Sequence, residues 1–315
     1  MHNYFYLLKC LLVSQEKLLH MVKKVKTLCS DLVDLGELDK DIDITGIVGL
    51  LSCSKNITRK EILNVYLPIA YHIVKFYTKN MLVANKTKNP FVIGVSGSVA
   101  VGKSSFSLLL QHLIRLLLPQ FKICLVSSDN FLFSNEKLQQ QGLFTRKGFP
   151  ESYDVKCQHY FIKAILDNEF PFEIPYYCHY IYDIVENKKN VMLQSDIIIL
   201  EGLNVLKNDV NEMNNGLLNF KDLVDFSIYI DARTDNIAKW YVKRFCYLKQ
   251  LAENNPTSYL HKFSNLNYEQ TSAYALDLWK NVNLLNLNEN ICLSKHDADF
   301  IIYKNGNHKV KHVCY

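Results

Sequence analysis

A short glycine-bounded motif restricts the fold of this 315-residue chain more than any other feature. Residues 97–104 read GSVAVGKS and fit the pattern G-x-x-x-x-G-K-[ST]. Residues 91–96 are rich in β-branched side chains and predict a strand, whereas residues 104–118 have helical composition and end before Pro119. A glycine-rich loop between a strand and a helix is typical of phosphate binding, so the sequence predicts a site for a nucleoside triphosphate.

Each part of this loop has a physical purpose. Gly97 and Gly102 let the backbone turn so that successive N–H groups converge on phosphate oxygens, and the following helix points its positive end at the same anion. Lys103 supplies a mobile charge for the β- and γ-phosphates, and the Ser104 hydroxyl is placed to bind Mg²⁺. The alternative, a chance glycine-rich turn, does not explain the strand and helix on either side. We expect the nucleotide to contact Gly97, Ser98, Val99, Ala100, Val101, Gly102, Lys103, Ser104 and Ser105.

Strand and helix patterns alternate after residue 90. Nearly continuous apolar runs predict strands at residues 123–127, 197–200, 226–230 and 300–303, and helical stretches separate them at 158–166, 235–251 and 268–285. This order indicates an α/β fold with a parallel sheet flanked by helices. Residues 1–90 predict a helical extension, with a kink or break at Pro68 and a polar linker at 84–90, so the core is expected over 91–315.

The composition excludes several classes of protein. Hydrophobic residues make up 49% of the chain and aromatic residues 12%, which excludes disorder over most of its length. The net charge of +5 is small and interspersed, which gives little support for a nucleic-acid or membrane partner. No apolar run reaches the roughly 18 residues of a spanning helix. Residues 4–13 are interpreted as an amphipathic helix, and nine cysteines without C-x-x-C spacing predict reduced thiols in a cytoplasmic protein.

Two carboxylates follow predicted strands. Asp129 comes after the run 123–127, and Glu201 comes directly after the run 197–200. Because open parallel sheets bind ligands beyond the carboxyl ends of their strands, we expect Asp129 to accept the proton of an attacking hydroxyl and Glu201 to hold Mg²⁺ or its water. The alternative for either residue alone is a helix or turn cap. Asp225 and Asp231 flank another strand and are expected to be turn residues.

Long intervals between the strands leave room for a second ligand. Residues 146–154 (RKGFPESYD) and 175–183 (PYYCHYIYD) combine aromatic rings with one imidazole, which suits a small polar organic substrate with an apolar body. An aromatic core cluster is the alternative. Arg244 lies in the predicted helix 235–251, where a guanidinium could reach phosphate oxygens, and the alternative is a solvated charge beside Lys243.

These segments together resemble the bacterial type I pantothenate kinases, from about residue 56 to near the C-terminus. The similar segments are residues 97–104, 147–154, 179–183, 200–206, 224–232, 240–245, 278–290 and 307–308. The resemblance implies a P-loop NTPase-type parallel sheet, a substrate-binding excursion at about 133–195 and a lid helix at about 235–251. It implies ATP-dependent phosphorylation of pantothenate, a homodimer, Mg²⁺ as cofactor and feedback inhibition by coenzyme A.

The resemblance also implies roles for individual residues. Asp129 corresponds to the base, Lys103 to the phosphate anchor and Arg244 to a residue that stabilises charge on the transferred group. Ser104 and Glu201 correspond to the Mg²⁺ positions, and His308 falls near the adenine site. The positions expected to contact pantothenate are Lys147, Tyr177, His179, Tyr182, Tyr241 and Asn283.

The chain departs from the family at two further positions. Leu108 stands where members carry an arginine that helps bind phosphates, which predicts weaker inhibition by coenzyme A, and Leu248 replaces a common phenylalanine. Two alternatives stay open. One is a small-molecule kinase like uridine kinase or phosphoribulokinase, and the other is a protein that senses nucleotide or coenzyme A without turnover.

Overall fold

The computed structural model describes residues 57–84, 90–208 and 216–315. The chain divides into two compact units, Met1–Ile69 and Ala70–Tyr315. The amphipathic helix expected at residues 4–13 lies outside the described residues, as does most of the expected linker. The predicted extension, core, excursion and lid boundaries stay predictions.

The first described helical stretch runs through Pro68 without a break. Helix α3 (Arg59–Glu61) starts at Thr58, whose side chain accepts a hydrogen bond from the backbone N–H of Glu61. A π-helical turn at Ile62–Tyr66 and helix α4 (Leu67–Ala84) follow directly. A proline ring inside a regular α-helix clashes with the carbonyl four residues earlier, so the wider turn just before Pro68 relieves that clash. The irregularity expected at Pro68 is therefore a π-helical turn.

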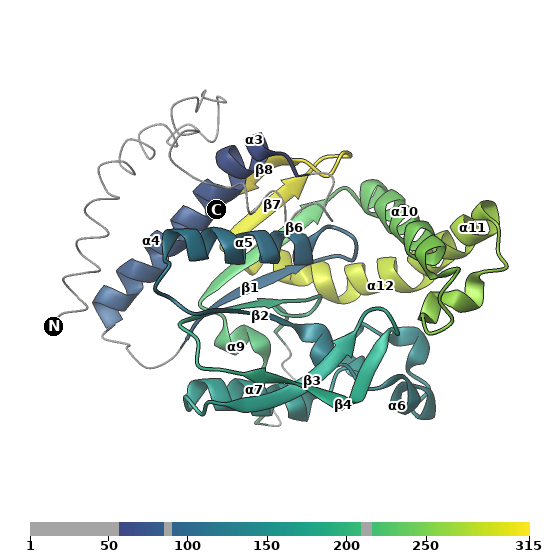
Figure 1. Cartoon of the computed structure of the whole chain (residues 1–315). Helices are drawn as coiled ribbons and strands as arrows, with labels where there is room; N and C mark the ends of the chain where they lie inside the picture. Colours follow the sequence, from purple (N-terminus) through teal and green to yellow (C-terminus); the bar gives the residue numbers. More distant parts are fainter. Residues whose placement is uncertain (1–56, 85–89, 209–215) are drawn as a thin grey trace. The chain divides into compact units, whose positions relative to one another are not determined.

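A six-stranded sheet forms the centre of the second unit (Figure 1). Its strand order is β2-β5-β1-β6-β7-β8, and every pair is parallel except β7 and β8. The strands are β1 (Phe91–Gly97), β2 (Ile123–Ser127), β5 (Ile197–Glu201), β6 (Phe226–Ala232), β7 (Phe300–Lys304) and β8 (Val310–Cys314). The α/β class and the five predicted strands are confirmed.

The sheet brings three strand ends to one edge. All seven residues of β1 are buried, as expected for a central strand covered on both faces. In the register, Val95 of β1 pairs with Glu201, and Ser127 of β2 pairs with Glu201 from the other side. The residues that follow β1, β2 and β5 therefore meet at the carboxyl edge of the sheet.

Helices cover both faces of this sheet (Figure 1). Helix α5 (Lys103–Leu117) packs on β1, β2 and β5, whereas α7 (Val155–Leu166) and α9 (Phe220–Leu223) pack with the opposite side chains of β5. The other α-helices are α6 (Asn135–Gln140), α10 (Thr234–Ala252), α11 (Tyr268–Leu278) and α12 (Leu284–Asn286). The 3₁₀ and π turns are Ser128–Phe131, Phe144–Arg146, Pro150–Ser152, Tyr259–Phe263, Trp279–Asn283, Leu287–Ile291 and Cys292–Asp297.

A separate antiparallel hairpin lies between α7 and β5 in the sequence. It consists of β3 (Phe172–Cys178) and β4 (Asp183–Met192), with an irregularity between Pro175 and Tyr177. These strands were not predicted, because an internal proline and many exposed polar side chains obscure their pattern. They form the scaffold of the segment that the sequence assigned to substrate binding.

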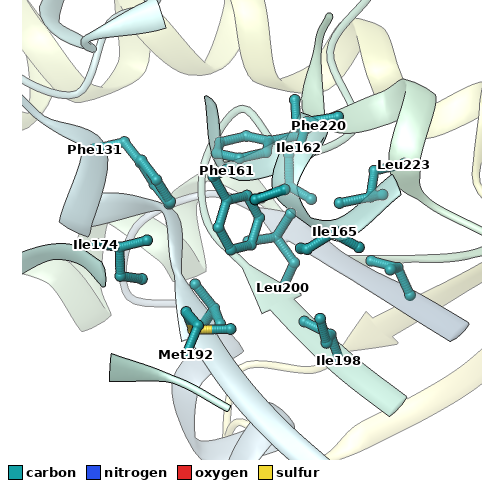
Figure 2. Packing of buried hydrophobic residues seen from close by; sticks show 14 of the residues in the cluster. Phe131, Phe161, Ile162, Ile165, Ile174, Met192, Ile198, Leu200, Phe220 and Leu223 are labelled. Carbon is teal, nitrogen blue, oxygen red and sulfur yellow. The ribbon is translucent and has the colours of Figure 1, made fainter. Parts of the chain in front are cut away.

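A buried aromatic cluster fixes this hairpin to the sheet (Figure 2). The rings of Phe131, Phe161 and Phe220 contact one another edge to face, with centroids 5.0 to 6.0 Å apart. They pack with Leu200 of β5 and Ile174 of β3, all almost fully buried. Burying aromatic rings stabilises a fold strongly, so this cluster holds the turn that carries Asp129 in a defined position.

No helix in the described part of the chain is long and apolar enough to cross a membrane.

Candidate active site

The loop after β1 has the backbone that its glycines predict. Gly97 and Gly102 have φ of +142° and +92°, and Ala100 has φ of +61°. A Cβ on Gly97 would lie 2.3 Å from the backbone oxygen of Ile230, so only glycine fits there. Such a sequence of turns directs successive N–H groups toward one point, which is the geometry of an anion site.

Lys103 and Ser104 begin α5 directly after this loop. The Lys103 ammonium donates to the carbonyl oxygens of Gly97 at 3.0 Å and Ser98 at 2.9 Å. The Ser104 hydroxyl donates to Glu201 Oε1 at 3.0 Å. The helix N-terminus, one ammonium and one carboxylate-bound hydroxyl therefore meet at the loop.

The ionisation of Lys103 shows which charges surround it. Burial is the largest influence and lowers the pKa of Lys103, and the Arg244 guanidinium lowers it further. The carboxylates of Glu201 and Asp129 act in the opposite direction and favour the charged lysine. Since these effects require proximity, Asp129, Glu201 and Arg244 all lie near the lysine of the loop.

Glu201 is a buried carboxylate at the end of β5, with 6% of its surface exposed. Burial raises its pKa, and the nearby Asp129 raises it further, whereas the charge of Lys103 and the hydrogen bond from Ser104 lower it. A buried carboxylate that shares its surroundings with another acid is stabilised by a cation, so its chemistry suits a metal-bound phosphate.

Asp129 follows β2 in the turn Ser128–Phe131. Its backbone N–H donates to the side chain of Ser127 at 3.3 Å. The carboxylate is 28% exposed, and its Oδ2 lies 3.9 Å from Nδ1 of His179, whose side chain is 64% exposed. Asp129 thus has the loop lysine on one side and the β3–β4 hairpin on the other.

Tyr177 and Tyr182 of the hairpin form the aromatic wall beside Asp129. Tyr177 is buried, and its ring lies 5.1 Å from that of His179 and 6.3 Å from that of Tyr182, measured between centroids. Burial raises the pKa of both phenols, and the Asp129 carboxylate adds to this. Both tyrosines therefore stay neutral hydrogen-bonding groups at ordinary pH.

Lys147 enters the same region from the loop before α7. Its ammonium lies 4.2 Å from the ring centroid of Tyr182 and 5.0 Å from that of Tyr177. The loop is held by the carbonyl of Gly148, which accepts hydrogen bonds from Asn286 at 2.8 Å and Asn204 at 3.2 Å. The segments 146–154 and 175–183 thus contribute both to the core, through buried Phe149 among others, and to the candidate site.

Helix α10 supplies the opposite wall. Tyr241 is hydrogen bonded to Asn283, which partly offsets the rise of its phenol pKa caused by burial. Arg244 lies one turn further along α10, and its side chain is exposed. The structure thus brings every catalytic, metal and acceptor residue predicted from the sequence to one region.

His308 lies at the turn between β7 and β8. Its ring is stacked on Trp240 of α10, with centroids 3.6 Å apart and planes inclined by 24°. Trp240 Nε1 donates to the carbonyl of Gly306 at 3.1 Å. Burial, Lys304 and Lys243 lower the pKa of His308 to about 4, so the imidazole is neutral.

Two of the weaker candidate residues have structural partners. Asp225 accepts a hydrogen bond from the backbone of Val92 at 2.8 Å, and Asp231 forms an ion pair with Lys295 at 2.6 Å.

Two residues of this region were not predicted from the sequence. They are Asn130, whose Oδ1 accepts a hydrogen bond from the backbone N–H of Tyr177 at 2.9 Å, and Trp240, which stacks on His308. A single asparagine after a strand carries no periodic signal. The described cysteines, which are Cys124, Cys157, Cys178, Cys246, Cys292 and Cys314, are all free.

The donor set fits a hard cation that shares its ligands with phosphate. Within the described ranges, no group of three or more His, Cys, Asp or Glu side chains could hold a metal ion. Ser104 and Glu201 offer two neighbouring oxygen ligands. Mg²⁺ commonly takes only one or two protein oxygens, with phosphate and water completing its shell, so these residues fit it.

Comparison with known proteins defines the class first. Residues 92–245 match the Phosphoribulokinase / Uridine kinase family, and this range contains the phosphate loop, Asp129, Glu201 and Arg244. The solved structure of D-glycerate 3-kinase from Cryptococcus neoformans has the same fold, with a TM-score of 0.56 at 12% identity over 79% of this chain and 98% of that one. The fold and the site define a P-loop kinase.

Two relatives define the family more closely. A pantothenate kinase from Streptococcus agalactiae is 41% identical over 272 residues, which are 83% of this chain and 87% of the relative. A pantothenate kinase from Halalkalibacterium halodurans is 38% identical over 275 residues, 84% of this chain and 86% of the relative. The chain belongs to the pantothenate kinase family, and the resemblance seen in the sequence is confirmed.

Proposed function

We propose that this kinase transfers the terminal phosphoryl group of ATP to the primary hydroxyl of pantothenate. The product is 4′-phosphopantothenate, and the reaction is the first step of coenzyme A biosynthesis. The observation that carries the proposal is the position of Asp129 between Lys103 of the phosphate loop and His179 of the hairpin. An alcohol bound beside the hairpin would have a base and a phosphoryl group on either side of its oxygen.

Asp129 acts as the general base. An ionised carboxylate accepts the hydroxyl proton as the oxygen attacks phosphorus, which avoids a positively charged intermediate. The Asp129 side chain is partly exposed and lies 3.9 Å from His179 of the hairpin, where a bound hydroxyl could reach it.

Lys103 and Arg244 stabilise charge on the phosphates. The ammonium moves from the loop carbonyls to phosphate oxygens, and the guanidinium can bind two of these oxygens at once. The loop residues 97–102 and Ser105 bind the phosphates together with the start of α5, and His308 lies beside the adenine. Bound to Ser104 and Glu201, Mg²⁺ would supply positive charge to the β- and γ-phosphates.

The acceptor is held by Lys147, Tyr177, His179, Tyr182, Tyr241 and Asn283. Neutral phenols and one amide provide directional hydrogen bonds, while their rings cover the apolar gem-dimethyl part of pantothenate. The ammonium of Lys147 adds a positive charge beside them.

We further propose a homodimer in the cytoplasm, where ATP is abundant and free thiols such as Cys124 stay reduced. Coenzyme A is proposed as a feedback inhibitor that competes for the phosphate loop. Its inhibition is weakened because Leu108, in the first turns of α5, offers no charge to a phosphate.

An ADP-release assay with separate acceptors tests the proposed function. The purified protein is incubated with ATP and Mg²⁺ and with pantothenate, uridine or ribulose 5-phosphate. ADP release only with pantothenate supports the proposal. Release only with uridine or ribulose 5-phosphate would reassign the substrate, and binding of ATP and pantothenate without any release would indicate a sensor.

A further inference from the structure

Asn135 joins three separate segments around the acceptor side of the site. It is the first residue of α6, and its backbone N–H donates to Asp183 Oδ1 at 2.8 Å. Its Nδ2 donates to the carbonyl of Tyr182 at 3.0 Å, and its Oδ1 accepts from Lys147 Nζ at 2.6 Å. All the hydrogen-bonding groups of this residue except its own carbonyl are therefore used at the hairpin turn and the Lys147 loop.

The Lys147 ammonium has two fixed partners. It donates to Asn135 Oδ1 and to the carbonyl of Tyr182, both at 2.6 Å. An ammonium has three N–H donors, so two strong hydrogen bonds fix its position and leave the third donor for a ligand oxygen. Lys147 is a flexible side chain, and without such partners its charge would have no defined direction.

The Tyr182 turn depends on the same contacts. Tyr182 has φ of +57°, a conformation that is rare for bulky side chains. Its carbonyl accepts hydrogen bonds from both Lys147 and Asn135, which hold the peptide in this orientation. Its ring lies against that of Tyr259, from the segment after α10, with centroids 4.9 Å apart and planes tilted by 33°.

We propose that Asn135 is a positioning residue for the phosphoryl acceptor, because it aims the Lys147 ammonium and holds the Tyr182 turn. It sets the affinity for the acceptor and leaves the nucleotide site unaffected, since none of its contacts reaches the phosphate loop. This inference rests on the proposed function, in which the acceptor is pantothenate.

The arrangement has a consequence for pH dependence. Burial lowers the pKa of Lys147 to about 8, while the carboxylates of Asp183 on β4 and Asp129 after β2 oppose this shift. Tyr177 on β3 and Tyr182 also face the ammonium and stay neutral. The Asn135 oxygen stabilises the charged lysine, so its loss deprotonates Lys147 at lower pH.

Steady-state kinetics of Asn135→Ala test the proposal. We expect the KM for pantothenate to rise about tenfold or more, as for loss of a hydrogen bond to a charged group, while the KM for ATP changes less than about twofold. Asn190→Ala is the matched control, because Asn190 Nδ2 donates to the carbonyl of Pro175 at 3.1 Å in the same hairpin without contacting Lys147. This control should leave both KM values near those of the wild type.

A second variant, Asn135→Asp, keeps an oxygen for Lys147 and adds a negative charge. The rise of the pantothenate KM at alkaline pH should move to higher pH in Asn135→Asp and to lower pH in Asn135→Ala. If a melting curve shows that Asn135→Ala does not fold, the proposal is tested by Asn135→Asp alone, through the pH at which its KM for pantothenate rises.

Three results would overturn the proposal while the wild type still phosphorylates pantothenate. These are an unchanged pantothenate KM in Asn135→Ala, an equal rise for both substrates, and an alkaline limb that does not move in Asn135→Asp. A wild type that does not phosphorylate pantothenate would overturn the proposed function and this inference together.

Discussion

At the scale of single residues, Asp129 depends on a neighbour that lacks a side chain. A Cβ on Gly202 would lie 1.8 Å from Ser128 Oγ and 2.6 Å from Ser128 Cβ. The chain after β5 therefore passes directly beside the residue that precedes Asp129. Because Gly202 also follows Glu201, this close approach keeps the two carboxylates near each other.

The substitution Gly202→Ala should destabilise the protein and displace Asp129. Overpacking of this kind costs about 1–3 kcal/mol, which urea unfolding measures directly. Adding Ser128→Gly removes the clashing atoms, so the double variant should be more stable than Gly202→Ala alone. A Gly202→Ala protein with wild-type stability and kcat would show that the two turns are not in contact.

The substitution Asp129→Ala should lower kcat by about 10²–10⁴-fold, the usual contribution of a general base. ATP binding, measured by calorimetry, should not weaken, because the phosphate loop and Lys103 are unchanged. Asp167→Ala is a suitable control, since Asp167 is an exposed aspartate at the end of α7. If the kcat of Asp129→Ala were close to that of the wild type, Asp129 would not be the general base.

At the scale of elements, α10 carries residues that we propose for both the nucleotide side and the acceptor side of the site. Trp240 and Tyr241 are adjacent in α10, and Arg244 lies one turn further along, so the three side chains share one side of the helix. Trp240 stacks on His308, and Tyr241 is hydrogen bonded to Asn283. The charge of Arg244 lowers the pKa of Lys103. A shift of α10 would therefore alter contacts on both sides.

The contact between α10 and the β7–β8 turn should depend on pH. The pKa of His308 is lowered from 6.5 to about 4 in the folded protein. Below about pH 6.5 the unfolded chain binds a proton that the folded protein does not bind, so stability is lost as the pH falls toward about 4.

The variant His308→Asn tests this effect, because asparagine tolerates the positive φ of +61° at this position. The wild type should lose more unfolding free energy than the variant between about pH 7 and about pH 4.5, measured by urea unfolding. The half-buried position of His308 limits the size of the effect through solvent screening. A difference between the two proteins that is the same at both pH values would contradict the assignment.

The elements differ in how far the sequence predicts them. The strands β1, β5 and β6 were found because both faces are buried and their apolar runs are continuous. The hairpin β3–β4 was missed because it contains Pro175 and because half of the residues of β4 are exposed. The helix predicted at 158–166 begins earlier, at Val155, since the Asp154 side chain accepts from the backbone of Cys157 at 3.1 Å.

At the scale of the whole molecule, the sequence predicts which residues lie at the edge of the sheet where a site could form, but it does not predict the contacts between them. Lys103, Ser104, Asp129 and Glu201 are identified by one motif and by strand ends, because a parallel sheet gathers its carboxyl ends at one edge. Contacts such as Asn135 with Lys147 arise where distant loops meet, and no local pattern records them. Their prediction requires the tertiary structure.

The proposed inhibition by coenzyme A concerns the whole molecule, and one substitution tests it. Leu108→Arg adds a charge one turn after Ser104 on α5. If coenzyme A phosphates bind near this turn, inhibition should strengthen about tenfold or more, as for a charge-assisted hydrogen bond. Inhibition constants for the wild type and the variant provide the test, with the KM for pantothenate as a control. Strong inhibition of the wild type that Leu108→Arg does not increase would contradict the expected weakening.

The most direct test of the central claim follows the phosphoryl group itself. The wild-type protein is given γ-labelled ATP and Mg²⁺ with equal concentrations of pantothenate and uridine, and the labelled product is identified. The account predicts that the label appears on the primary hydroxyl of pantothenate. Label in uridine, or only in inorganic phosphate, would contradict it.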